Sequence, residues 1–150
     1  MLIGIPEVMN PELMYILMSM GHGDELVIGD INFPQELVES GRVVYCKGLD
    51  NQQMLDAITK LMPLDHFVDD PVTLMEPGEL YKGVPPIWEK YDEILKKNDV
   101  CKAYKEFNKM ERFAFYERAK KAFAVVATSE PSLYACMIIK KGCIGDFGQD

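Results

Sequence analysis

Residues 20–30 read Met-Gly-His-Gly-Asp-Glu-Leu-Val-Ile-Gly-Asp, and this short stretch carries signals for more than one structural element. Residues 26–28, Leu-Val-Ile, are apolar and bounded by glycine, which is typical of a strand buried on both faces. Gly21 favours a helix end, because glycine tolerates the left-handed conformation that closes helices. The stretch therefore predicts a helix followed by a buried strand, with His22 in the connection and Asp30 at the strand's carboxyl end.

The rest of the chain alternates between the same two kinds of pattern. Asn10 and Pro11 are a favoured N-cap and first residue for the helix that ends near Gly21. Apolar residues at helical spacing predict further helices at 54–62, after 86 and over 111–121. Strand-like runs are found at 42–45, 72–75, 122–128 and 134–139. Strands alternating with helices predict a single α/β domain over residues 1–150, with a mostly parallel or mixed sheet covered on both faces.

Charge and composition exclude several classes of partner. The formal net charge of −8 should repel phosphate backbones and anionic lipids, so neither nucleic acid nor a membrane is expected as a partner. The longest apolar runs fall far short of the roughly 20 residues that span a bilayer, and the N-terminus lacks the basic region of a signal peptide. The four cysteines show no Cys-x-x-Cys spacing, which indicates reduced thiols and a cytoplasmic protein.

Familiar catalytic motifs are missing from the sequence. There is no Gly-x-Gly-x-x-Gly, phosphate-binding loop, Gly-x-Ser-x-Gly or His-Glu-x-x-His, so nucleotide, serine-hydrolase and zinc-peptidase chemistry lose support. A metal site built from His22, Asp24 and Asp30, joined by His66, is an alternative, although one or two histidines are few for such a set.

His22, Asp30 and Arg112 each have a structural and a functional interpretation. His22 is either a loop residue satisfied by a nearby carbonyl or Asp24, or a proton-transfer group in a loop where glycines let a ligand approach. Asp30 is either a turn residue or a ligand anchor, because ligands bind outside the carboxyl ends of strands in open α/β sheets. Arg112 opens an amphipathic helix expected to bury Phe115 and Ala119, and its planar fork suits ligand oxygens.

The chain resembles the RbsD/FucU family of monosaccharide mutarotases, and within it the L-fucose mutarotase branch. The resemblance implies an RbsD-like three-layer α/β/α fold and a cofactor-independent isomerase that interconverts the α and β anomers of a free sugar. It also implies a homo-oligomer, because several members form decameric rings with active sites near subunit contacts. The matching motifs cover nearly the whole chain: 10–13, 20–25, Asp30 with Phe33-Pro34, 112–128 and 139–142.

The resemblance assigns roles to particular residues. His22 would be the catalytic proton donor, and Asp30, Arg112, Tyr134 and Cys136 would contact the sugar. The branch typically has Tyr-Gly-Asn where this chain has Tyr134-Ala135-Cys136, and a thiol is a weaker donor and acceptor than an amide. The sugar preference therefore stays open, with L-fucose favoured and another sugar such as ribose as an alternative.

Two further points stay open at this stage. The base that accepts the anomeric proton is Tyr116, a water molecule or a residue of a neighbouring subunit, while Asp24 is expected to orient His22 rather than to touch sugar. A sugar-binding accessory protein without catalysis is the alternative from a different functional class.

Overall fold

The computed structural model describes residues 1–145, and in three of its four helices the residue before the first turn satisfies free N–H groups with its side chain, the exception being the helix that begins at Pro86. The Asn10 side chain accepts a hydrogen bond from the Leu13 N–H at 2.8 Å, as a favoured N-cap should. Asp50 and Gln53 form a capping box, in which each side chain binds the other residue's backbone N–H. The helices are α1 (Pro11–Ser19), α2 (Asn51–Leu61), α3 (Pro86–Asn98) and α4 (Arg112–Lys120).

Six strands form one mixed sheet in the order β2-β5-β1-β6-β3-β4. β6 runs antiparallel to both of its neighbours, and the other paired strands are parallel, which confirms the predicted mixed sheet. The strands are β1 (Glu25–Gly29), β2 (Val43–Cys46), β3 (Val72–Met75), β4 (Asn108–Met110), β5 (Ala124–Thr128) and β6 (Met137–Lys140), with a short 3₁₀ helix η1 (Gln35–Leu37) between β1 and β2.

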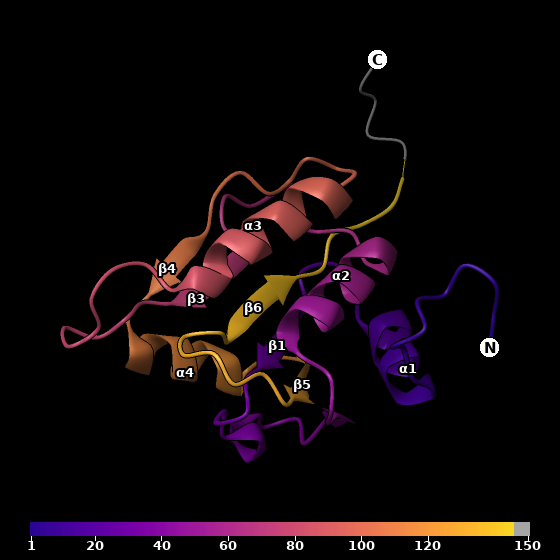
Figure 1. The fold of residues 1–150 in the computed structure, drawn as a ribbon. Helices are drawn as coiled ribbons and strands as arrows, with labels where there is room; N and C mark the ends of the chain where they lie inside the picture. The colour runs from indigo at the N-terminus through magenta and orange to yellow at the C-terminus, as the bar shows by residue number, and fades with distance from the viewer. Residues whose placement is uncertain (146–150) are drawn as a thin grey trace.

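The sheet is covered on both faces, and this confirms the three-layer fold. In β1, Leu26 and Ile28 pack in the larger core with α1, α2 and α3, whereas Val27 points to the opposite face and packs in a second core with α4. Figure 1 shows α2 and α3 side by side on one side of the sheet and α4 on the other. Phe115 and Ala119 of α4 are fully buried, as the amphipathic pattern predicts.

The structure differs from the sequence-based expectations at two strands. β4, the polar edge strand, was not expected, because its three residues Asn-Lys-Met show no run of apolar side chains. The expected strand over 134–139 begins only at Met137, since Tyr134 has a left-handed φ of +56° that no strand accommodates.

Arg118 also differs from the expectation, because the charged residues of its helix were predicted to form ion pairs with one another on the surface. Lys120 and Glu117 do form such a pair at 2.6 Å. Arg118 instead crosses to β1, where its guanidinium donates to both carboxylate oxygens of Glu25, and it also donates to Asp70 at 3.2 Å. Arg118 therefore links α4 to the sheet through these ion pairs.

Within residues 1–145, each helix is too short or too polar to cross a bilayer.

Candidate functional site

A cavity of about 360 Å³ lies at the carboxyl end of β1, within the size range of small-molecule sites. It brings together four of the five predicted site residues and the candidate base Tyr116. Its wall also contains aromatic and apolar side chains that the sequence did not single out. The lining residues are Asp30, Asn32, Phe33, Met75, Leu80, Tyr81, Arg112, Tyr116, Leu133, Tyr134 and Cys136.

Asp30 serves both as a turn residue and as a polar group of this cavity. Its Oδ1 accepts a hydrogen bond from the Asn32 N–H at 2.9 Å, which fixes the carboxylate just after β1. The strand keeps glycine at position 29 because a Cβ there would come within 2.9 Å of the Phe33 Cβ. The Asp30 carboxylate thus enters the cavity on a tight turn, with Oδ2 left for a ligand donor.

Cys136 forms part of the cavity wall beside Asp30. The Asp30 N–H points at the Cys136 Sγ at 3.4 Å, and the side chain is only 5% exposed. Burial raises the pKa of the Cys136 thiol well above its ordinary value, and the negative charge of Asp30 raises it further. The group is therefore a neutral thiol at physiological pH, a weak partner for a polar ligand.

Arg112 and Tyr134 supply the other polar groups of the cavity. Arg112 is the first residue of α4, and its guanidinium lies 5.7 Å from the centre of the Tyr116 ring. The Tyr134 hydroxyl accepts a hydrogen bond from the Gly78 N–H at 3.1 Å, and its ring meets Tyr81 edge-on. A cation, a carboxylate and phenols around one cavity can bind several hydroxyl groups and hold them in a fixed orientation.

His22 lies at the other end of β1, outside this cavity. It lines a second cavity of about 430 Å³ with methionines and leucines of α1 and α2. The five residues of β1 alone span roughly 16 Å at the usual rise of a strand, so a monosaccharide bound at Asp30 is out of reach of His22 in the same chain. The structure therefore does not bring His22 together with Asp30, Arg112, Tyr134 and Cys136.

Asp65 is the partner of His22, and the expectation that Asp24 orients the imidazole is wrong. The His22 Nε2 lies 2.9 Å from the Asp65 Oδ1, which also accepts from the Phe67 N–H at 3.1 Å. Asp24 instead accepts from the Gly21 N–H at 2.7 Å and closes the loop locally. A carboxylate on Nε2 fixes that nitrogen as the N–H donor, so Nδ1 is the nitrogen left for proton exchange.

Burial and hydrogen bonding act in opposite directions on Asp65. Burial raises the pKa of its carboxyl, but the hydrogen bonds from His22 and the Phe67 N–H, together with the positive charges of His22 and Lys140, outweigh it. The net result is a pKa below the usual range, so the side chain is a carboxylate at neutral pH. Sequence spacing could not reveal this pair, since 43 positions separate the two residues.

The His22 loop is held in place by the residues that follow β6. The Lys141 ammonium donates to the Leu17 and Met20 carbonyls at the end of α1, and the Gly23 N–H donates to the Lys141 carbonyl at 2.8 Å. Gly142 follows, where a Cβ would clash with the Leu64 backbone. This close approach places Asp65 next to His22 and explains the glycine at the end of the 139–142 motif.

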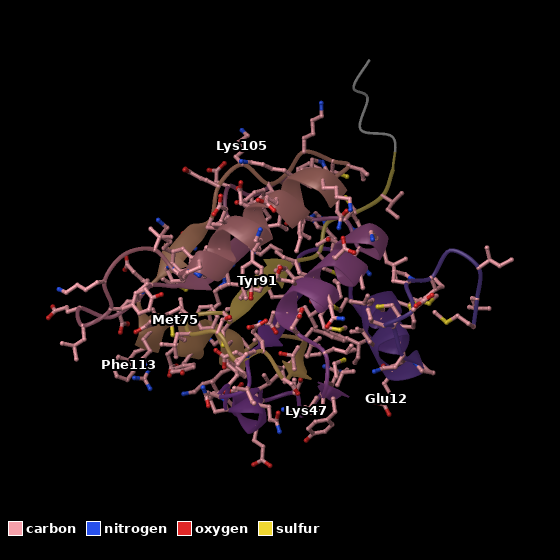
Figure 2. All side chains as sticks on the ribbon, viewed as in Figure 1. Glu12, Lys47, Met75, Tyr91, Lys105 and Phe113 are labelled. Atoms are coloured by element: carbon pink, nitrogen blue, oxygen red, sulfur yellow. The ribbon has the colours of Figure 1, made fainter. Side chains whose placement is uncertain are left out.

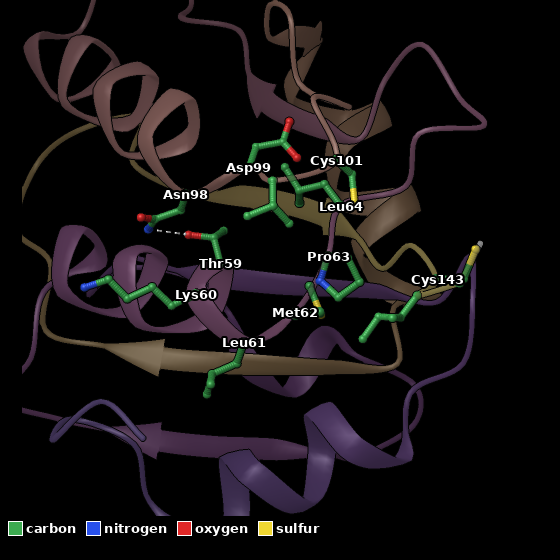
Figure 3. Close-up of a pocket in the computed structure, with 13 residues that line it drawn as sticks. Thr59, Lys60, Leu61, Met62, Pro63, Leu64, Asn98, Asp99, Cys101 and Cys143 are labelled. Carbon is green, nitrogen blue, oxygen red and sulfur yellow. Dashed lines mark hydrogen bonds between the residues drawn. The ribbon is translucent and has the colours of Figure 1, made fainter. Parts of the chain in front are cut away.

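A third cavity, of about 330 Å³, lies where α2 and α3 end (Figure 3). In its wall the Asn98 side chain donates to the Thr59 hydroxyl at 3.0 Å. None of the predicted site residues lines this cavity, and it shares residues 61–63, Cys143 and Ile144 with the cavity of His22.

The metal alternative is not supported by this arrangement. His22 and Asp30 occupy opposite ends of β1, so the proposed set of ligands is not assembled. Among residues 1–145, no three His, Cys, Asp or Glu side chains gather closely enough to hold a metal ion.

Comparison with known proteins gives a consistent picture. Residues 3–144 match the RbsD / FucU transport protein family. A fucose mutarotase of Mus musculus is 49% identical over 146 residues, 94% of each chain. The crystal structure of the fucose mutarotase from Streptococcus pneumoniae in complex with L-fucose superposes with a TM-score of 0.87 at 37% identity, covering 96% of this chain and 100% of that one. FucU from Bifidobacterium longum gives a TM-score of 0.88 at 43% identity, over 95% and 99%.

Proposed function

Because the chain belongs to the RbsD/FucU family, we propose that it is a cofactor-independent fucose mutarotase that interconverts the α and β anomers of free L-fucose. The observation that carries this proposal is the cavity in which Asp30, Arg112 and Tyr134 meet, in a fold that superposes on a fucose mutarotase holding L-fucose. The four cysteines are free, in keeping with action in the cytoplasm.

The proposed mechanism opens and recloses the pyranose ring. A base removes the proton of the anomeric hydroxyl while an acid protonates the ring oxygen, and the resulting aldehyde recloses on either face. We assign the acid to His22, whose imidazolium gives up its Nδ1 proton while the Nε2–H stays bound to Asp65, and the base to Tyr116, which lines the Asp30 cavity and accepts the proton as the phenolate. Asp30 and Arg112 bind hydroxyl groups, and each proton-transfer group contributes roughly 10² to 10⁴-fold to the rate.

A second copy of the chain completes this site, because one chain keeps His22 and Asp30 apart. Exposed apolar side chains surround both half-sites, with Met18 and Ile144 in the His22 cavity and Leu80 and Leu133 in the Asp30 cavity. Two different apolar surfaces at opposite ends of one molecule suit head-to-tail contacts, which close into rings when the rotation permits. We therefore propose a homo-oligomeric ring in which each site takes His22 from a neighbour.

Complementation between two inactive variants tests the shared site. We expect chains carrying only His22→Ala, or only Asp30→Asn, to be inactive as homo-oligomers. When the two are co-expressed in equal amounts, about one quarter of the sites combine an intact His22 with an intact Asp30, so about one quarter of the activity should return. A site contained within one chain predicts no recovery at all.

Saturation-transfer NMR on L-fucose tests the activity itself, with D-ribose as a comparison sugar. The unmodified protein should accelerate anomer exchange. His22→Ala should still bind L-fucose but exchange anomers near the spontaneous rate, because the ring-oxygen proton donor is gone. Binding without acceleration in the unmodified protein would contradict the proposal and favour a sugar-binding accessory protein.

A further inference from the structure

We propose that Trp88 and Tyr91 of α3 are positioning residues that hold the sugar-binding turn at 134–136 in its active shape. This inference rests on the proposed function, because it assigns to two buried side chains the placement of Tyr134 and Cys136 in the Asp30 cavity. Neither Trp88 nor Tyr91 lines that cavity, and both are at most 5% exposed. They act from behind the turn, through its backbone.

The turn needs such support because its backbone conformation is unfavourable. Tyr134 has a φ of +56°, in the left-handed region that residues other than glycine, asparagine and aspartate rarely adopt. A non-glycine residue keeps this backbone conformation only where the surrounding structure imposes it, and such residues cluster at binding sites. The conformation turns Tyr134 towards Gly78 and leaves Cys136 beside Asp30.

Three side chains bind the two carbonyl groups of this turn from the interior. The Trp88 Nε1–H donates to the Tyr134 carbonyl at 2.9 Å, and the Tyr91 hydroxyl donates to the Ala135 carbonyl at 2.7 Å. The Asn51 amide donates to the same Ala135 carbonyl at 2.9 Å. Ala135 is fully buried, so water could not replace these donors, and without them its carbonyl would be left without a hydrogen bond.

Tyr91 is suited to this role because its hydroxyl is a permanent donor. Burial raises the pKa of the Tyr91 phenol, so the side chain keeps its proton across the physiological range. Figure 2 labels Tyr91 in the middle of the molecule, while Met75 of the cavity wall lies nearer one edge. The same helix begins directly after the loop that carries Gly78, so the Tyr134 hydroxyl and carbonyl are both held from one segment.

Tyr91→Phe tests the role, with Tyr104→Phe as the matched control. Each change removes one hydroxyl from a buried tyrosine, but the Tyr104 hydroxyl donates to Asp92 at 2.7 Å, away from the turn. We expect Tyr91→Phe to raise KM for L-fucose about 3- to 10-fold, the usual effect of one hydrogen bond, with kcat within about two-fold. Trp88→Phe should do the same, and Tyr104→Phe should change neither constant.

The indole group provides a readout that does not depend on activity, because Trp88 is the only tryptophan in the sequence. Its Nε1–H is buried and hydrogen-bonded, so its NMR signal should exchange slowly with water and shift when L-fucose is added. We expect exchange at least about tenfold faster in Tyr91→Phe than in Tyr104→Phe, because the turn that accepts this bond is loosened.

The outcomes separate the two proposals. An unmodified protein that does not accelerate anomer exchange overturns the function, while the indole exchange rates still test the turn. An active protein in which Tyr91→Phe and Trp88→Phe leave KM unchanged, as Tyr104→Phe does, or lower kcat without raising KM, overturns the positioning role. Should Tyr91→Phe fail to fold, Trp88→Phe decides the question through KM.

Discussion

Replacing Asp65 with asparagine separates the charge of this residue from its hydrogen bonds. His22 and the Phe67 N–H both bind the same atom, Oδ1, so an asparagine keeps an acceptor for both and loses only the charge. Hydrogen bonds to charged groups contribute about 1 to 2 kcal/mol more than neutral ones, so Asp65→Asn should lower kcat roughly 5- to 30-fold. KM should stay within about two-fold, because the proposed mechanism binds the sugar hydroxyl groups at Asp30 and not at Asp65.

Asp65→Ala and Asp24→Asn complete the series, assayed by NMR exchange at saturating L-fucose. Asp65→Ala removes the acceptor as well as the charge, and we expect a fall of roughly 10- to 150-fold in kcat. Asp24 lies in the same loop as His22 but binds the Gly21 N–H, so Asp24→Asn should leave kcat within about two-fold. A kcat for Asp65→Asn equal to that of the unmodified protein, or an equal loss in Asp24→Asn, would refute the assignment of Asp65.

Three further predictions concern stability and binding. Folding lowers the pKa of Asp65, so the stability that this residue contributes is complete above its unfolded value of about 3.9 and is lost as pH falls through the folded pKa. The urea unfolding free energies of the unmodified protein and Asp65→Asn should therefore begin to converge only as pH falls below about 4. Arg118→Met leaves Glu25 without its partner and should cost about 3 kcal/mol in urea unfolding, whereas Lys120→Met, at an exposed pair, should leave the urea midpoint unchanged. Cys136→Asn adds an amide to the cavity wall and should lower KM for L-fucose about threefold, with Cys136→Ser as the control, and an unchanged KM would show that this side chain does not contact sugar.

Local patterns in the sequence were sufficient for most of the fold. Caps, helical spacing and short apolar runs identified α1, β1 and the buried face of α4, because each depends on neighbours a few positions away. β4 was not predicted, because this short edge strand forms through pairing with β3 and its own composition does not favour a strand. The turn at Tyr134 was not predicted, because its left-handed backbone is held by side-chain hydrogen-bond donors from α2 and α3, far away in the sequence.

The site was predicted in part for the same reason. Asp30 could be placed from its position at the end of an apolar strand. The motifs shared with the family pointed to Arg112 and Tyr134, which line the same cavity, and to His22, which does not. The pairing of His22 with Asp65 and its separation from Asp30 depend on how β1 and β6 lie in the sheet. No spacing along the chain contains that information.

β6 connects the two half-sites, and this gives the antiparallel strand a functional role. Just before β6, the Cys136 thiol accepts a hydrogen bond from the Asp30 N–H. At the other end of the strand, the Lys140 carbonyl accepts a hydrogen bond from the Asp65 N–H, and the Lys141 carbonyl accepts one from the Gly23 N–H. The strand is fully buried at residues 137–139 and paired on both sides, so it cannot shift alone. Because one rigid strand holds both Asp30 and the His22 loop, the geometry of the proposed site shared between copies would depend on how neighbouring chains dock, and not on flexibility within either chain.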